Sequence, residues 1–115
     1  MNIFEVKKAI FSEFIGSVMI GFFSGYANFR YQYQGYDVME NALVQAISVA
    51  ALSWVFFNKS GAHFNPLQSF MMIIAKRLRT AVGVFYILAQ FLGYLLGASL
   101  LMFVGPSKDL EVPAN

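Results

Sequence analysis

The chain has 115 residues, which is enough for one domain. Hydrophobic residues make up 58% of it and charged residues only 12%, whereas about a quarter of the residues in a soluble domain are charged. This balance excludes an ordinary water-soluble domain and points to lipid as the surrounding solvent. The absence of cysteine excludes disulfides and thiolate metal sites, and the net charge of +2 gives no reason to expect a nucleic-acid partner.

The first apolar segment, residues 9–27, directly follows Lys7 and Lys8. As a helix it would be about 28 Å long, close to the roughly 30 Å of a bilayer's hydrocarbon core. It is too long for the apolar part of a cleavable signal peptide, and it contains Glu13. We therefore expect a retained membrane span, in which Glu13 braces other groups rather than relaying protons.

Residues 42–57 and 81–104 are the next long apolar segments. They would form helices of about 24 Å and 36 Å; the first can lengthen toward Val38, and the second can span the membrane with tilt. Residues 28–40 are polar and rich in tyrosine, and they predict a loop at the membrane interface. Residues 105–115 predict a weakly ordered tail, so we expect a single all-α membrane unit.

A fourth apolar segment, residues 67–75, is much shorter. It would form a helix about 13 Å long, close to half the hydrocarbon core. Asn65 is a good N-cap, Pro66 suits the first helical position, and the segment ends at the basic residues 76–79. The pattern predicts a half-helix that enters and leaves the membrane on one side.

Glycines recur four residues apart in two of the predicted spans. Gly21 and Gly25 lie in the first span, and Gly93 and Gly97 lie in the third. This spacing lets helix backbones approach closely in lipid. We interpret it as general helix packing rather than as a specific dimerisation motif, because such pairs are frequent in glycine-rich spans.

The basic residues are distributed unevenly about the predicted spans. With the N-terminus inside, six lie on the inner side, namely Lys7, Lys8, Lys59, Lys76, Arg77 and Arg79. Only Arg30 and Lys108 lie on the outer side. The bias predicts that the N-terminus and both ends of the half-helix lie on the inner face. The membrane itself can be a plasma membrane or an organelle inner membrane, and the sequence does not choose between them.

Residues 60–68, which read Ser-Gly-Ala-His-Phe-Asn-Pro-Leu-Gln, carry most of the functional information. They describe a glycine-containing loop that leads into the half-helix. Irregular backbone at membrane depth requires protein or water to satisfy it. The positive end of the half-helix and the amide donors of Asn65 would hold the oxygen of water or an alcohol and repel cations and protons.

This segment resembles the aquaporin and glycerol-facilitator family, the major intrinsic proteins, whose first half carries Ser-Gly-Ala-His-x-Asn-Pro-Ala. Glu13-Phe-Ile-Gly16 resembles the family's first-helix motif. Tyr86-Ile-Leu-Ala-Gln90-Phe-Leu-Gly93 resembles its third-helix motif, and the spacing from Asn65 to Gln90 matches without a gap. The resemblance covers nearly the whole chain and implies a half-aquaporin fold.

The resemblance also implies roles for single residues. Asn65 would be the pore-facing donor at the centre of the channel, and Glu13 and Gln90 would brace the re-entrant loop. The inner vestibule would be lined by three backbone carbonyls, those of Gly61, Ala62 and His63. His63 stands without a second histidine or cysteine nearby, so no metal site is expected.

The sequence departs from the family pattern at three points. Leu67 replaces the alanine after Asn-Pro, and this larger side chain is expected to narrow or displace the half-helix contact at the midplane. Gln45 falls at the second-helix filter position, which is often phenylalanine in water channels. The family's second half, with its filter arginine, does not occur in these residues. Because the halves are inverted repeats, two copies could pair only in opposite orientations, which would place Gln68 after each Asn-Pro; the charge bias opposes that arrangement.

Two functions remain open. In the first, the chain is a half-channel that passes water or small neutral solutes when a complementary half completes the pore. In the second, it is a non-conducting structural subunit of a larger membrane complex. Membrane lipid and other membrane subunits are the expected partners, no cofactor is expected, and a truncated channel fragment is the least favoured reading. No nucleophile–base pair or phosphate-binding loop suggests an enzyme.

Overall fold

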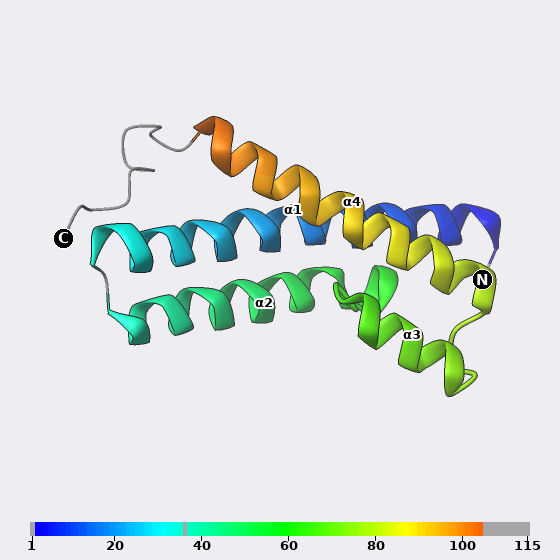
Figure 1. Ribbon diagram of the computed structural model, residues 1–115. Helices are drawn as coiled ribbons and strands as arrows, with labels where there is room; N and C mark the ends of the chain where they lie inside the picture. The colour runs from blue at the N-terminus through cyan, green and yellow to red at the C-terminus, as the bar shows by residue number, and fades with distance from the viewer. Residues whose placement is uncertain (1, 36, 105–115) are drawn as a thin grey trace.

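The computed structural model describes residues 2–35 and 37–104, and within them every regular element is a helix (Figure 1). The elements are α1 (Ile3–Gln34), α2 (Val38–Ser60), α3 (Pro66–Ile74) and α4 (Thr80–Val104). Three of them, α1, α2 and α4, are long and apolar enough to cross a membrane. The expected all-α fold with three long helices and one short helix is confirmed, whereas the expected tail at residues 105–115 lies outside the described residues.

The prediction of a polar loop at residues 28–40 is wrong, because α1 continues to Gln34 and α2 begins at Val38. Gly35, with φ 70°, ends α1 in the left-handed conformation, and the Asp37 side chain caps α2. Asn28 of α1 accepts hydrogen bonds from Asn41 and Gln45 of α2 at 3.0 and 3.3 Å. The polar residues thus join the ends of two helices instead of forming a loop.

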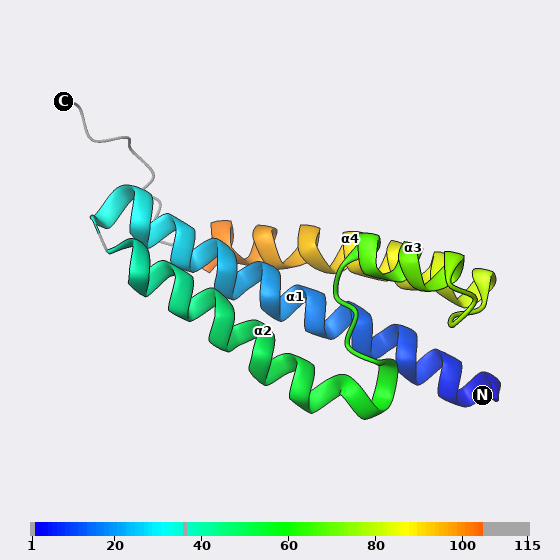
Figure 2. The ribbon, with the colours of Figure 1, turned by 90° about the horizontal axis from the view of Figure 1, so that it is seen from below.

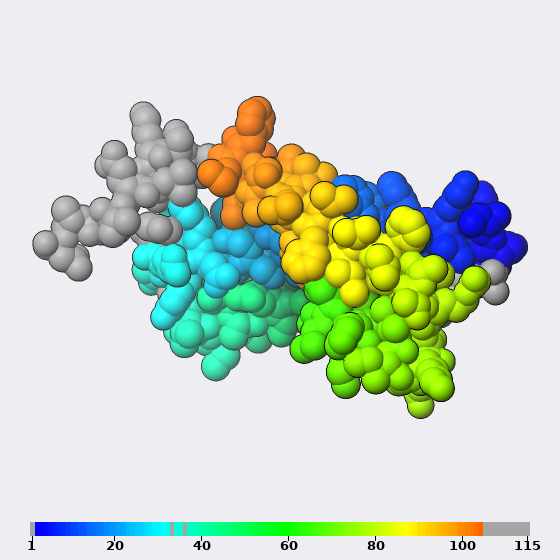
Figure 3. All heavy atoms as spheres, turned by 45° about the vertical axis from the view of Figure 1, so that its right-hand side comes forward, coloured from blue at the N-terminus to red at the C-terminus, as the bar shows by residue number. Residues whose placement is uncertain are grey.

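Helix α1 lies between the other two long helices and packs against both α2 and α4 (Figures 1 and 2). The short helix α3 packs against α4, beside its N-terminal half. In the space-filling view α3 stands out from the body of the molecule next to α4 (Figure 3). The first turns of α1 and α4 lie at the same end of the molecule, and Ala9 packs there against Val82 and Tyr86.

Small residues set the separation of α1 and α4. A Cβ atom on Gly93 would lie 2.7 Å from the carbonyl oxygen of Phe14, and one on Gly97 would overlap the carbonyl oxygen of Val18. A Cβ atom on Gly21 would lie 3.1 Å from the ring of Tyr94. The glycines therefore bring two backbones into direct contact, which is how helices gain packing energy in lipid.

We expect Gly97→Leu to push α4 away from α1 and to destabilise the protein by about 1–3 kcal/mol or more, because the overlap is with backbone that cannot rotate away. Thermal unfolding of the detergent-solubilised protein measures the effect. The matched control is Ala98→Leu, which adds a similar volume at an exposed neighbouring position of α4. Equal melting temperatures for the two variants would contradict this account of the contact.

Candidate pore-lining site

The loop of residues 61–65, between α2 and α3, adopts a backbone that ordinary residues avoid. Gly61 ends α2 with φ 87°, and its N–H donates to the carbonyl oxygen of Phe57 at 2.9 Å. Ala62 and Phe64 follow with φ values of 52° and 51°. Non-glycine residues in this region are strained, so something outside the loop must hold them there.

Glu13 supplies that support from α1. Its side chain is fully buried, and its two carboxylate oxygens accept the backbone N–H groups of His63 at 2.9 Å and of Phe64 at 2.7 Å. The side-chain amide of Gln90 on α4 donates to the same carboxylate at 2.9 Å. Because an unpaired buried charge is very unfavourable, the three donors are what allow a carboxylate at this position.

The spacing of Glu13 and Gly16 has a direct structural reason. Residues three apart lie on one face of a helix, so both residues face the loop. While Glu13 binds the backbone of Phe64, the aromatic ring of Phe64 lies so close to Gly16 that a Cβ atom there would overlap it. The ring also packs against Ile20 and Leu52 in a small apolar cluster.

Three further side chains hold the loop, and the sequence predicted this role for none of them. Ser69, buried on α3, lies with its hydroxyl 2.9 Å from Nδ1 of His63 and accepts from Gln90 at 3.0 Å. The hydroxyl of Tyr86 donates to the carbonyl of Ser60 at 2.8 Å, and that of Tyr94 donates to the carbonyl of Phe64. Two features of the sequence could have indicated them: a serine lies one turn after Asn65, and the tyrosines lie within an otherwise apolar span.

Asn65 sits at the start of α3 as its N-cap, as predicted, with Pro66 in the first turn. Its side-chain oxygen accepts the N–H of Leu67 at 2.9 Å, which points that oxygen toward the helix. The NH₂ group of the exposed Asn65 side chain remains for other partners. The helix start therefore presents hydrogen-bond donors and the positive end of the helix dipole.

This helix start borders a hollow of about 240 Å³ to which every helix contributes. Four of the predicted site residues line it, namely Ala62, His63, Asn65 and Gln68. It is also lined by five residues that were not predicted as site residues, which are Ile20, Val49, Ser53, Phe64 and Tyr94. Val49 and Ser53 are four residues apart and so share one face of α2, which is the signal that could have found them.

The other four residues predicted for the pore and the half-helix lie outside this lining. Pro66 forms the first turn of α3. Gly61 forms the end of α2, and Leu67 is 65% exposed next to the start of α3. Gln45 lies one helical turn before Val49 on α2, and its amide donates to Asn41 at 2.8 Å and to Asn28 at 3.3 Å. Gln45 is therefore held by a polar cluster between α1 and α2 rather than grouped with Asn65.

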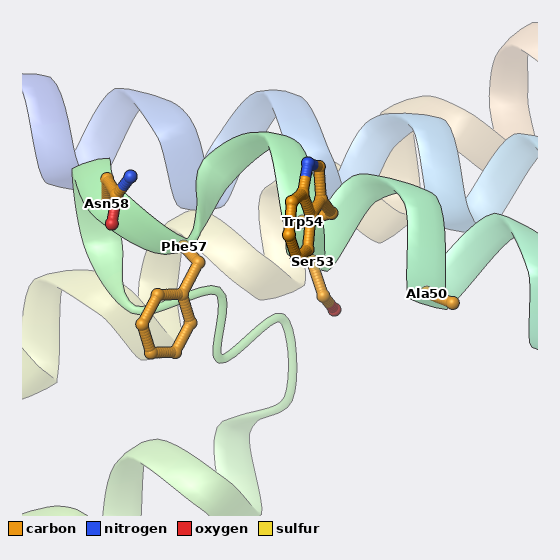
Figure 4. A pocket seen from close by; sticks show the side chains of 5 residues that line it. All are labelled: Ala50, Ser53, Trp54, Phe57 and Asn58. Carbon is orange, nitrogen blue, oxygen red and sulfur yellow. The ribbon is translucent and has the colours of Figure 1, made fainter.

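A second hollow, of about 540 Å³, lies along the outer surface of α2 (Figure 4). Its lining consists of Ala50, Ser53, Trp54, Phe57 and Asn58. Ser53 borders both hollows, and Trp54 is 86% exposed. Within the described residues, no group of three or more His, Asp or Glu side chains could hold a metal ion.

Comparison with known proteins is consistent with this geometry. The family model described as "Major intrinsic protein" matches residues 1–114. The lens fiber major intrinsic protein of Lithobates pipiens is 32% identical over 90% of this chain, and that of Ovis aries is 31% identical over 86%. A sequence named aquaporin-2 from Talpa europaea is 29% identical over 88% of this chain and 93% of its own length. The chain spans only 40% and 38% of the two lens proteins.

We expect Glu13→Gln to loosen the loop. The three N–H donors that now share the two oxygens of the carboxylate would have only the one oxygen of the amide. Hydrogen bonds to charged groups contribute about 1.5–3 kcal/mol each, so the variant should melt at a clearly lower temperature. Hydrogen exchange at the amides of His63 and Phe64 should speed up markedly. Glu40→Gln, at an exposed position in the first turn of α2, is the control. Unchanged protection of those two amides would refute the role given to Glu13.

Proposed function

Because this chain belongs to the major intrinsic protein family, we propose that it is one half of an aquaporin-like channel for water or small neutral solutes. It is an integral membrane protein, with α1, α2 and α4 as the membrane spans. The pore is complete only when a complementary half covers the open side of the hollow at Asn65, whichever polypeptide supplies that half.

The observation that carries this proposal is the start of α3 at the edge of the hollow. As a nine-residue helix, α3 is about 13 Å long, or roughly half the hydrocarbon core. We propose that it enters the membrane from one side and that Asn65 lies near the midplane. The amide donors and the helix dipole there would hold the oxygen of a neutral solute and oppose the passage of cations.

The distribution of charge supports one orientation. Lys7 and Lys8 lie in the first turns of α1, and Arg77 and Arg79 directly precede α4, whose start lies at the same end of the molecule. Arg30 lies near the far end of α1. By the positive-inside rule, this distribution supports an N-terminus on the inner face. Lys108, the other predicted outer residue, lies outside the described residues.

The surface of α2 supports the need for a second half. Polar groups that line the hollow, such as Asn65 and Gln68, cannot be satisfied by lipid tails. The adjoining hollow on α2 shares Ser53 with this surface and leaves Trp54 almost fully exposed (Figure 4). A protein wall across both hollows would enclose the polar groups and leave water as their partner.

A second candidate function is a non-conducting structural subunit of a larger membrane assembly. The exposed Leu67 side chain favours it, because it stands beside Asn65 where the family has the smaller alanine. A leucine there would crowd whatever approaches the start of α3. The same contact surface would then serve assembly without passing solute.

The absence of cysteine allows a direct test of conduction. We expect vesicles of native membrane that contain the Gln68→Cys variant in its assembly to shrink rapidly under osmotic stress. A charged, water-soluble thiol reagent should slow that shrinkage severalfold, because Gln68 lines the hollow. Phe103→Cys, at an exposed position near the end of α4, is the control and should be insensitive. A rate of shrinkage equal to that of membranes that lack the chain would contradict the channel proposal.

Leu67→Ala separates the two candidate functions. If the chain conducts and Leu67 narrows the pore, the variant should raise osmotic permeability severalfold in the same vesicles, because the side chain loses three carbons beside Asn65. If the chain is a structural subunit, both proteins should leave permeability at background. Thermal unfolding should change little, since the side chain is exposed.

A further inference from the structure

A separate apolar groove of about 540 Å³ lies along the contact between α1 and α4. It is lined by Lys7, Ile10, Phe11 and Phe14 of α1 and by Phe85, Leu88, Ala89 and Leu92 of α4. None of these residues borders the hollow at Asn65 or the one on α2. The volume is in the range of small-molecule sites, which is about 300–1,000 Å³.

The groove has a charged end and an apolar body. Lys7 lies in the second turn of α1, and Phe14 lies about 10 Å farther along the helix. On α4, residues 85–92 run alongside in the same direction from the same end of the molecule. About 10 Å is less than half the hydrocarbon core. With the start of α1 at one membrane face, the groove would therefore fit within one leaflet and have its cation toward the headgroups.

The floor of the groove is made by a small side chain. Ala89 is buried where α4 meets α1, whereas Phe11, Phe85 and Leu92 are all more than half exposed along the groove. The large side chains around Ala89 leave a shallow groove that is open along its length. A flexible hydrocarbon chain fits such a groove, because it can follow the contact between the two helices.

Lys7 sets the charge of the occupant. Its side chain is exposed, so the ammonium group can extend to the headgroup region while its carbon stem covers the groove. Lysine binds phosphate as a point charge. Glu5, the nearest acidic residue in sequence, is two positions away and therefore faces another direction on the helix.

We propose that this groove binds an anionic phospholipid, with one acyl chain over Ala89 and the headgroup phosphate at Lys7. The site does not depend on whether the chain conducts. It lies on α1 and α4 only, so a complementary half that covers the start of α3 and the surface of α2 leaves it open to lipid. A lipid bound there would cover the contact between α1 and α4 on its outer side.

The test compares lipid retention by the protein purified in a neutral detergent. Phosphatidylglycerol and phosphatidylcholine with identical acyl chains are added, and the bound lipid is counted by native mass spectrometry. We expect phosphatidylglycerol to bind at least severalfold more tightly. Lys7→Gln should abolish most of this preference, whereas Lys59→Gln, at the end of α2, should keep it. Equal binding of the two lipids, or equal effects of the two variants, would overturn the proposal.

A position-specific readout keeps the proposal testable if a variant folds poorly. Trp54 is the only tryptophan, so Trp54→Phe combined with Phe85→Trp places a single fluorophore in the groove. Phosphatidylglycerol with brominated acyl chains should quench it more strongly than the matched phosphatidylcholine does. Ala89→Leu, which fills the floor, should reduce quenching by both lipids. Equal quenching by the two lipids, or quenching unaffected by Ala89→Leu, would rule out the site.

Discussion

The buried carboxylate of Glu13 is the interaction on which the rest of the structure depends. A loop with two non-glycine residues in the left-handed conformation does not satisfy its own backbone donors. Glu13 accepts two of them and also meets Gln90, so one side chain joins α1, the loop and α4. A neutral side chain of the same size offers fewer acceptor sites, and a charge with fewer donors would not remain buried.

This arrangement requires α1 and α4 to lie unusually close together. The glycines of α4 allow backbone contact with α1, which brings Gln90 within hydrogen-bond distance of Glu13. On α1, Gly16 has no side chain and so leaves room for the ring of Phe64. Helix packing and loop support therefore depend on each other. A side chain added at one of these glycines, or the loss of the Glu13 carboxylate, would disturb the same contacts among α1, the loop and α4.

The supported loop places the start of α3 at the edge of a hollow. Asn65 and Gln68 line this hollow, which shares Ser53 with the hollow on the surface of α2. In a membrane such groups need water or another protein surface. The groove between α1 and α4 presents apolar walls and one cation, Lys7, at one end. The two surfaces therefore differ in chemistry, which is why we propose a protein neighbour for the first and lipid for the second.

The sequence by itself determined the three long helices and the short one, because apolar length and the Asn65-Pro66 cap are local signals that do not depend on distant residues. It also singled out Asn65 and Glu13 through the resemblance to a family. The sequence-based prediction failed at residues 28–40, where polar residues extend two helices. Asn41 and Gln45 donate hydrogen bonds to Asn28, and only folding brings these segments together. Ser69 and Tyr94 were missed for the same reason: each is an ordinary residue of its own helix until tertiary structure places its hydroxyl against the loop.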